Sequence, residues 1–367
     1  MASTEYQIIL YDKSGIKKAL ITDYYELYYI NRRNAVSDCQ FILNYDHPAM
    51  AFIEDKGHVE IKRRNRDLGL AWYTDFTGLI RYVAYSRQTE AVTKVAVRAY
   101  SLIHVLEWRV DGFYANTSGK NTAASVYAER LMKDLVRYNF TACAVPAYGR
   151  IRSGSMTGYG ITLQSGCTSG CLIDSWSGAH EIIVPNLQQI AEDGGGDFDL
   201  IKTASNVFDF RFYANQRGTD RSASLLFSMD RNNMAEPSYT MDRYNEKTVA
   251  FIGGRGEEEE RNIITLTGLD FVGNGNDIEF FYNATQTSGS KYLLFQGYKE
   301  LETRRAKGVL TFTVLQTPQC FYGLHYTWGD KIKAVFENVS ACMIVDAVTV
   351  RVHQDGGDGI EVDLRQI

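Results

Sequence analysis

Apolar and polar residues alternate through most of this chain, and the alternation is clearest near its C-terminal end. In residues 329–353, GDKIKAVFENVSACMIVDAVTVRVH, small and β-branched apolar residues alternate with polar ones around a polar turn at Glu337 and Asn338. A period of two places successive side chains on opposite faces of a strand. The segment therefore predicts two antiparallel strands, each with one buried face.

A weaker copy of this pattern occupies residues 57–85. It also opens on a glycine, alternates through Val59 and Ile61, crosses a polar linker and continues as DFTGLIRYVAY. Two similar hairpins near opposite ends of one chain suggest a duplicated β module. Two unrelated hairpins explain the pattern about as well, because hairpins are common.

Other segments follow the same rule or switch to helical spacing. Alternating runs predict further strands at 6–11, 21–30, 39–44, 92–100, 197–203, 207–213, 225–229, 249–252, 262–268 and 309–315. Apolar residues at three- and four-residue steps predict three helices. These helices are 122–140, with Asn121 as the expected N-cap, 185–193, which three glycines follow, and 291–307.

Together these elements predict a mainly β protein with an α+β insertion. We expect two tube-like β-barrel modules and a small helix-containing domain, because 367 residues are many for one domain. The first β module should occupy residues 1–115. The α+β domain, with its Gly/Ser-rich insertion, should occupy 116–235, and the second β module, including helix 291–307, should occupy 236–367.

Composition narrows the classes of function. The net charge of −5 argues against a stable nucleic-acid binder, which should carry a basic face. No apolar run approaches the ~20 residues of a membrane-spanning helix. The first residues lack the basic start and apolar core of a secretion signal, so we expect a protein made in a reducing cytoplasm.

Two clusters carry candidate chemistry without a complete constellation. Cys167, Cys171 and His180 have a spacing that zinc tolerates, but a fourth ligand is missing nearby, and ordinary cysteines in a Ser/Gly loop are the simpler interpretation. Asp197 and Asp199, after three glycines, form either a weak carboxylate site or a helix stop followed by a strand. We predict no catalytic residue, no metal and no cofactor.

The sharpest local feature is GGRGEEEER at residues 253–261. A glycine cluster after a strand can cradle phosphate, but four glutamates would repel it, and no P-loop lysine follows. We therefore predict a solvated hairpin tip or an interface loop. Its interface candidates are Arg255, Glu257, Glu258, Glu259, Glu260 and Arg261.

A stripe of tyrosines covers Tyr24, Tyr25, Tyr28 and Tyr29. In a basic protein such a stripe would be a stacking platform for single-stranded nucleic acid. In this acidic chain we expect core residues together with a subunit interface, where tyrosine is enriched.

Several longer strings resemble one known family. They are DFTG near Asp75, the helix followed by GGGDFD at 189–199, RGTDRS and FSMDRNNM after Arg217, SYTMDRYNEKTVAFIGGRGEEEERN up to residue 262, and LQTPQCFYGLHYTWGDKI near the C-terminus. They resemble the Pepy-type tail-hub family of siphophage minor tail proteins. This family is similar in architecture to the baseplate hub proteins of contractile tails.

The resemblance implies a structural virion protein at the tail tip rather than an enzyme. Hubs of this kind resemble homotrimers in which each chain supplies two barrels, so that a sixfold tail tube meets a threefold tip around the DNA exit channel. The implied partners are the distal tail protein ring, the C-terminus of the tape-measure protein, a tip fibre or spike, and genomic DNA in passage. Two alternatives stay open: a carbohydrate- or receptor-binding tail module, and a cell-wall hydrolase that uses the glutamates at 257–260.

Overall fold

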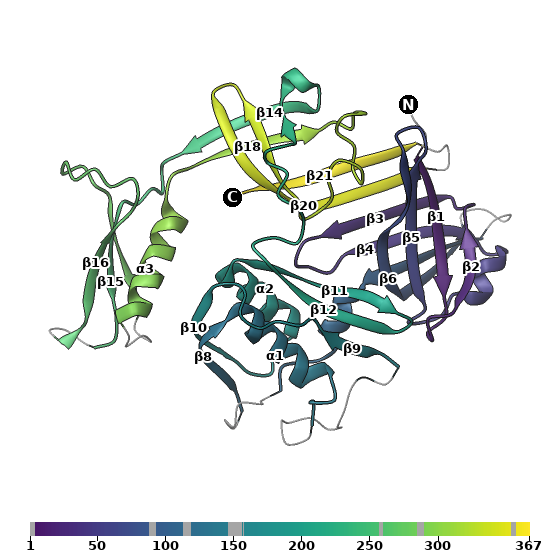
Figure 1. Ribbon diagram of the computed structural model, residues 1–367, viewed down its shortest axis with the longest axis horizontal. Coiled ribbons are helices and arrows are strands. Elements are labelled where there is room, and N and C mark those ends of the chain that lie inside the picture. Colours follow the sequence, from purple (N-terminus) through teal and green to yellow (C-terminus); the bar gives the residue numbers. More distant parts are fainter. Residues whose placement is uncertain are drawn as a thin grey trace. The chain divides into compact units, whose positions relative to one another are not determined.

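The computed structural model describes residues 4–87, 93–112, 119–145, 156, 158–256, 260–284, 290–353 and 357–367. It is mainly β, as the alternation predicts (Figure 1). The chain forms two compact units: unit 1 contains residues 1–235 and 313–367, and unit 2 contains residues 236–312. Unit 2 is thus inserted into the chain of unit 1.

Unit 1 is built on one 11-stranded sheet with the order β13-β19-β20-β3-β4-β7-β6-β5-β1-β2, and β21 pairs with β20. The short helix η1 (Pro48–Phe52) lies between β4 and β5 in sequence. The strands are β1 (Thr4–Tyr11), β2 (Lys17–Ile21), β3 (Glu26–Arg32), β4 (Asp38–Asn44), β5 (His58–Asn65), β6 (Leu70–Arg87), β7 (Thr93–Ser101), β13 (Leu226–Phe227), β19 (Lys331–Phe336), β20 (Val339–His353) and β21 (Asp358–Gln366).

Both hairpins predicted from the alternation are confirmed. Strands β5 and β6 pair antiparallel, and so do β19 and β20, which are joined by the predicted turn at Glu337 and Asn338. Both hairpins belong to the same sheet, because β20 also pairs with β3. The strands expected in a separate C-terminal module therefore extend the sheet of the N-terminal strands, and the strand pairs in the described ranges close no barrel.

The predicted α+β part also lies in unit 1. It contains helices α1 (Ala128–Phe140) and α2 (Ile183–Gly194), the 3-10 helices η2 (Leu102–Trp108) and η4 (Met229–Arg231), the sheet β11-β12-β9 and the pair β10-β8. These strands are β8 (Asn121–Tyr127), β9 (Gly160–Leu163), β10 (Leu172–Gly178), β11 (Gly196–Ala204) and β12 (Val207–Ala214).

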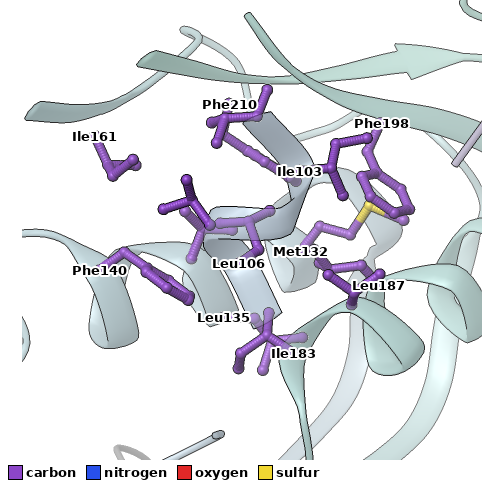
Figure 2. Close-up of a cluster of buried hydrophobic side chains, with 14 of the residues drawn as sticks. Ile103, Leu106, Met132, Leu135, Phe140, Ile161, Ile183, Leu187, Phe198 and Phe210 are labelled. Carbon is purple, nitrogen blue, oxygen red and sulfur yellow. The ribbon is translucent and has the colours of Figure 1, made fainter. Parts of the chain in front are cut away.

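A single apolar core joins these elements. Phe198 and Phe210 from the sheet meet Met132 of α1, Leu187 of α2 and Leu106 of η2 (Figure 2). Each of these side chains is at most 3% exposed. Burial of aromatic and branched side chains from sheet and helices is the main stabilising term for such a layer.

The helix expected over 122–140 is only half correct. Helix α1 begins at Ala128, and residues 121–127 form β8, which pairs with β10. Asn121 is not the N-cap; its side chain donates to the Asp111 carboxylate at 2.8 Å. Thr122, Val126 and Tyr127 suit a strand, and the tertiary pairing with β10 overrides the helical spacing.

The second predicted helix is confirmed with its glycine stop. Helix α2 ends at Gly194, and Gly195 adopts the left-handed conformation with φ 65°. Strand β11 then begins at Gly196. The sequence GGGDFD is therefore a helix stop followed by a strand, one of the two interpretations considered above.

Unit 2 is small. Its sheet has the order β16-β15-β17, with β15 (Val249–Gly253), β16 (Ile263–Thr267) and β17 (Glu279–Asn283), and α3 (Ser290–Arg304) is the predicted third helix. Strands β14 (Met234–Asp242) and β18 (Lys307–Val314) pair with each other, and they contain the two points at which the chain passes between the units. Its main buried cluster contains Ala250, Ile252, Leu266, Ala284, Leu293 and Leu301. In the ranges given above, no helix is long and apolar enough to cross a membrane.

Candidate functional site

The interface candidates from the sequence surround the turn between β15 and β16 in unit 2. Arg255 and Glu260 are exposed there, as a solvated tip requires. Glu257, Glu258 and Glu259 lie outside the described residues. Their role in an interface stays a prediction.

Arg261 has a structural task within this turn. Its guanidinium donates to the carbonyl oxygens of Gly253 at 3.2 Å and Gly254 at 3.3 Å, and to the Asn283 side chain. It also lies 5.1 Å from the ring centre of Phe281. A Cβ on Gly253 would lie 2.7 Å from this guanidinium, so the glycine makes room for it. Arg261 thus ties the tip to β15 and β17.

Unit 2 exposes many large apolar side chains. Tyr244 is 90% exposed, Leu269 82% and Val272 73%. The others are Tyr239, Met241, Ile263, Phe271, Ile278, Phe281, Leu294, Tyr298 and Val309. Concentrations of exposed apolar residues of this kind mark interaction surfaces in soluble proteins.

Unit 1 contains a different arrangement, which we call the polar seam: the carboxylates Asp75, Asp197 and Asp330 with the side chains bound to them. Each carboxylate comes from a different part of the chain and accepts several hydrogen bonds. Together they join the N-terminal strands, the α+β part and the C-terminal strands.

Asp75 accepts hydrogen bonds from two buried tyrosines. The Tyr29 hydroxyl donates at 2.7 Å and the Tyr322 hydroxyl at 2.8 Å, and the Asn31 amide donates to the Asp75 carbonyl at 3.0 Å. Burial raises the pKa of the Asp75 carboxyl above its usual value, while the charge of Arg63 acts to lower it. Asp75 therefore connects β6 to β3 and to the segment before β19.

Arg63 is the buried cation beside this carboxylate, and its side chain is 0% exposed. It donates to the Tyr322 carbonyl at 2.8 Å, and its guanidinium lies 4.9 Å from the ring centre of Phe321 and 5.0 Å from that of Tyr322. The Asp358 carboxylate is 3.9 Å away. Aromatic faces stabilise a desolvated guanidinium, so the 321–322 segment holds Arg63 of β5 in place.

Asp197 is fully buried at the start of β11. It accepts from Arg33 at 2.5 Å, from the Asn34 amide at 2.9 Å and from the Arg217 backbone N–H at 2.7 Å. Arg33 also donates to Asp346 at 2.8 Å, which adds the C-terminal strand β20. One arginine therefore bridges the α+β part and the large sheet.

Asp330 organises the third junction. It accepts from the backbone N–H groups of Thr219 at 2.6 Å and Thr327 at 2.9 Å, and from Arg221 at 2.7 Å. A Cβ on Gly218 would lie 2.3 Å from the Asp330 carboxylate and 2.4 Å from its backbone nitrogen. The RGTDRS and WGD strings therefore pack directly against each other, and Gly218 permits the close approach.

A cavity of about 420 Å³ is lined in part by Asp75 of the seam. Its lining includes two ion pairs, Lys202 with Glu60 at 2.9 Å and Arg217 with Asp199 at 2.8 Å. Arg217 also lies 3.5 Å from the ring centre of Trp328. These charges are paired with one another, and the pairs join β5 to β11 and β11 to the segment after β12.

Cys167 and Cys171 are free, exposed thiols. Among the residues that the structure describes, no group of three or more His, Cys, Asp or Glu side chains is placed to hold a metal ion.

Two residues of the tyrosine stripe, Tyr28 and Tyr29, lie on opposite faces of β3. Tyr29 is fully buried in the core, which confirms half of the expectation. Tyr28 points to the other face, where Arg351 lies 5.1 Å from its ring centre. Its role in a subunit interface remains a prediction.

Sequence reasoning missed the polar seam as a unit. Asp75, Asp197 and Asp330 each stand in one of the strings that carried the family resemblance, and that recurrence was the available signal. Their partners were not visible, because Arg63 and Tyr322 are far apart in the chain. Charged residues inside strands are a further signal, since they are rarely buried unless paired.

A known protein family matches nearly the whole chain. Residues 7–364 match the family model described as Siphovirus ReqiPepy6 Gp37-like protein. No curated protein matches significantly.

Solved structures with a similar fold include phage tail proteins. The tail protein from Neisseria meningitidis MC58 has a TM-score of 0.58 at 12% identity, covering 99% of this chain and 97% of its own. The 43 kDa tail protein of prophage MuSo2 from Shewanella oneidensis has 0.59 at 11%, covering 98% of both chains. The prophage tail protein gp18 from Listeria monocytogenes EGD-e has 0.58 at 11%, covering 98% and 94%.

Proposed function

The chain belongs to the family of Siphovirus ReqiPepy6 Gp37-like proteins, and we propose that it is the hub at the tip of a long, non-contractile phage tail. The family places it among the structural proteins of phage tails. In the proposed role, a homotrimer joins the sixfold tail tube to the threefold tip and lines the channel through which DNA leaves. The observation that carries this proposal is the family match over residues 7–364, together with a fold shared at full length with phage tail proteins.

The polar seam supports the proposal of a rigid structural protein. Each carboxylate of the seam binds groups from segments that are distant in the chain, so the N-terminal, central and C-terminal parts of unit 1 are held together. Charge-assisted hydrogen bonds are stronger and more directional than neutral ones. A hub must keep its geometry while tube and tip are attached, and the hydrogen bonds and ion pairs of the seam would provide that rigidity.

Unit 2 supplies the proposed attachment surface. Its exposed apolar residues and the charged tip at Arg255 and Glu260 have the composition of a docking region. We assign to the hub the partners of such a tip: the distal tail protein ring, the tape-measure C-terminus, and a tip fibre or spike. Genomic DNA passes without lasting contact, consistent with a net charge of −5.

Imaging tests this role directly. Tails that carry an affinity tag on this chain should show the label at the tip, distal to the tube, with threefold symmetry. Mass determination of the purified chain should give a trimer. Label along the tube, or absence from assembled tails, would contradict the proposal.

Exposed aromatic side chains in unit 2, such as Tyr244 and Phe281, favour a second candidate: a carbohydrate- or receptor-binding module of the tail. Binding of the isolated chain to host glycans, lost in Tyr244→Ala, would favour this function. A hydrolase is tested by incubating the chain with host cell walls, with glutamates 257–260 changed to glutamine as the control. Wall degradation that disappears in this variant would establish the enzyme.

A further inference from the structure

Strand β11 of unit 1 is held at both of its ends. Near its start, Asp197 belongs to the polar seam. Beyond its end, the turn between β11 and β12, residues 205–206, contacts the turn between β1 and β2, residues 12–16. We call the contact between these two turns the clasp.

Two hydrogen bonds and close packing form the clasp. The Asn206 amide donates to the Lys13 carbonyl oxygen at 2.7 Å, and the Ser205 hydroxyl donates to the Gly15 carbonyl oxygen at 3.3 Å. A Cβ on Gly15 would lie 3.0 Å from the Cβ of Ser205. The two turns therefore touch directly, and this contact ties the end of β11 to the N-terminal strands.

His58 of β5 is buried beside the clasp. Its residue is 0% exposed, its ring centre lies 5.9 Å from that of Phe208 on β12, and Leu79 of β6 is its cross-strand neighbour. Neither ring nitrogen forms a hydrogen bond of ordinary length and angle with the described residues, although the Asn206 side chain acts to favour the charged form. A buried charge without partners is costly, so the closed structure tolerates His58 only in its neutral form.

The charges around His58 come from several packed segments. Lys202 of β11 opposes a charged imidazole, whereas Glu60 of β5 and Asp12 of the β1–β2 turn favour one. Glu54, in the segment before β5, accepts from a backbone N–H of the same turn at 2.9 Å. The nearest groups thus include both signs of charge, and desolvation has the largest effect on the imidazole.

Both carboxylates that favour the charged imidazole are already engaged. Glu60 pairs with Lys202 at 2.9 Å and accepts from the Tyr11 hydroxyl at 2.7 Å. Asp12 pairs with Lys18 at 3.1 Å. A new positive charge would have to compete with these cations, so the closed clasp has no carboxylate in reserve for it.

We propose that the clasp is released by acid: uptake of a proton by His58 separates the β11–β12 turn from the turn at residues 12–16. An imidazolium has two N–H donors, and the closed clasp offers them one uncommitted acceptor, the Asn206 side-chain oxygen. Separation of the turns admits water to both donors. Asp197 still holds the start of β11, so the release is confined to the far end of the strand.

The pH window follows from the two forms of the clasp. Burial lowers the pKa of His58 from 6.5 to about 4 in the closed form, and the exposed imidazole of the open form has its ordinary value. The closed form is therefore favoured fully above pH 6.5, and this advantage is lost as the pH falls towards 4. Between pH 7 and pH 5 the ratio of open to closed clasp should rise about 20-fold.

Amide hydrogen exchange of the full-length chain tests the release. Protection in peptides that cover residues 10–18 and 203–208, corrected for the intrinsic pH dependence of exchange, should fall about 20-fold between pH 7 and pH 5. Peptides of β3 and β4 are the internal control and should keep their protection. His58→Gln, which does not titrate, should abolish the fall.

A second variant and a direct titration cover the case in which His58→Gln does not fold. Asn206→Gly keeps the positive φ of this turn and removes the hydrogen bond to Lys13, so both turns should lose protection together already at pH 7. In the natural chain, the fall in protection should follow the titration of His58 measured by NMR. Loss of protection in one turn alone would show that the turns do not open as one unit, which overturns the proposal.

The remaining outcomes are equally decisive. An equal loss of protection in β3 and β4 would show general unfolding, and an unchanged acid response in His58→Gln would assign the response to another group; either result overturns the release. So does constant protection of both turns down to pH 5. This inference is independent of the proposed hub, which depends on the position of the chain in tails.

Discussion

Unit 1 buries charged side chains, whereas unit 2 exposes apolar ones. In unit 1, Arg63 and Asp197 are 0% exposed and bound by groups from distant segments. In unit 2, Leu269 is 82% and Tyr244 90% exposed, and the main buried cluster consists of small and branched residues such as Ala250, Ile252 and Leu293. Unit 1 binds its buried charges with groups from distant segments, whereas unit 2 leaves large apolar side chains exposed.

The difference follows from how each unit is assembled. Unit 1 combines two stretches of chain that unit 2 separates. Its segments therefore need specific contacts that determine how they pair. A buried charge costs much free energy unless its partner is in place, and this penalty rejects wrong pairings. Unit 2 is continuous in sequence and needs no such fastening; its apolar surface suits docking.

Breaking the polar seam should have the largest effect. Arg63→Met removes the buried cation and leaves Asp75 without a compensating charge, so the free energy of unfolding should fall by about 3–5 kcal/mol. Chemical denaturation followed by near-UV circular dichroism measures this. Arg66→Met, whose side chain is 67% exposed, should cost less than about 1 kcal/mol. Equal losses of stability in the two variants would show that the buried Arg63 stabilises unit 1 no more than an exposed arginine does.

Unit 2 should unfold independently of unit 1. Leu293→Ala deletes a fully buried side chain from its small core and should destabilise it by about 2–5 kcal/mol. Amide hydrogen exchange should show loss of protection within residues 236–312, while protection in β3 and β4 is retained. The neighbouring change Leu294→Ala, at a 40% exposed residue, is the control. Loss of protection throughout unit 1 would contradict the independence of the units.

Acid should weaken unit 1 through His58, which is fully buried on β5. Burial, with the positive charge of Lys202, lowers the pKa of His58 to about 4 from 6.5. Between these values the unfolded chain takes up a proton that the folded chain refuses, so stability falls as the pH falls through this window. His58 should account for about 2 kcal/mol of loss at pH 5.

The test compares denaturation at pH 7 and pH 5 for the natural chain and for His58→Gln, which does not titrate. The variant should lose less stability than the natural chain over this interval. Unit 2 contains no histidine, so its hydrogen exchange should not report this transition. The same acid loss in both proteins would exclude His58 as the cause.

Two glycines give the smallest and most local comparison. A Cβ at Gly218 would lie 2.3–2.5 Å from Asp330 and from the Gly329 backbone, and the backbone there cannot yield cheaply. Gly218→Ala should therefore cost about 1–3 kcal/mol. At Gly253 of unit 2 the Cβ would meet the ends of the Phe281 and Arg261 side chains, so Gly253→Ala should cost less than about 1 kcal/mol. Thermal denaturation of both variants gives the ranking, and its reversal would contradict the packing argument.

The sequence by itself determined the local elements. Period-two alternation located the hairpins β5–β6 and β19–β20, and the glycines at 194–196 located the end of α2. These features depend on residues adjacent in the chain, so a short window contains the physical information. The strings around Asp75, Asp197 and Asp330 also identified the family, although not what the aspartates bind.

Tertiary structure alone decided where those elements go. Residues 121–127 became a strand because β10 pairs with them, against their helical spacing. Strand β20 joined β3 rather than a separate module, and Arg63 found its carbonyl partner at Tyr322. Each outcome depends on desolvation and hydrogen bonding between residues far apart in the chain. The periodicity of one segment does not identify the distant segment with which it will pair.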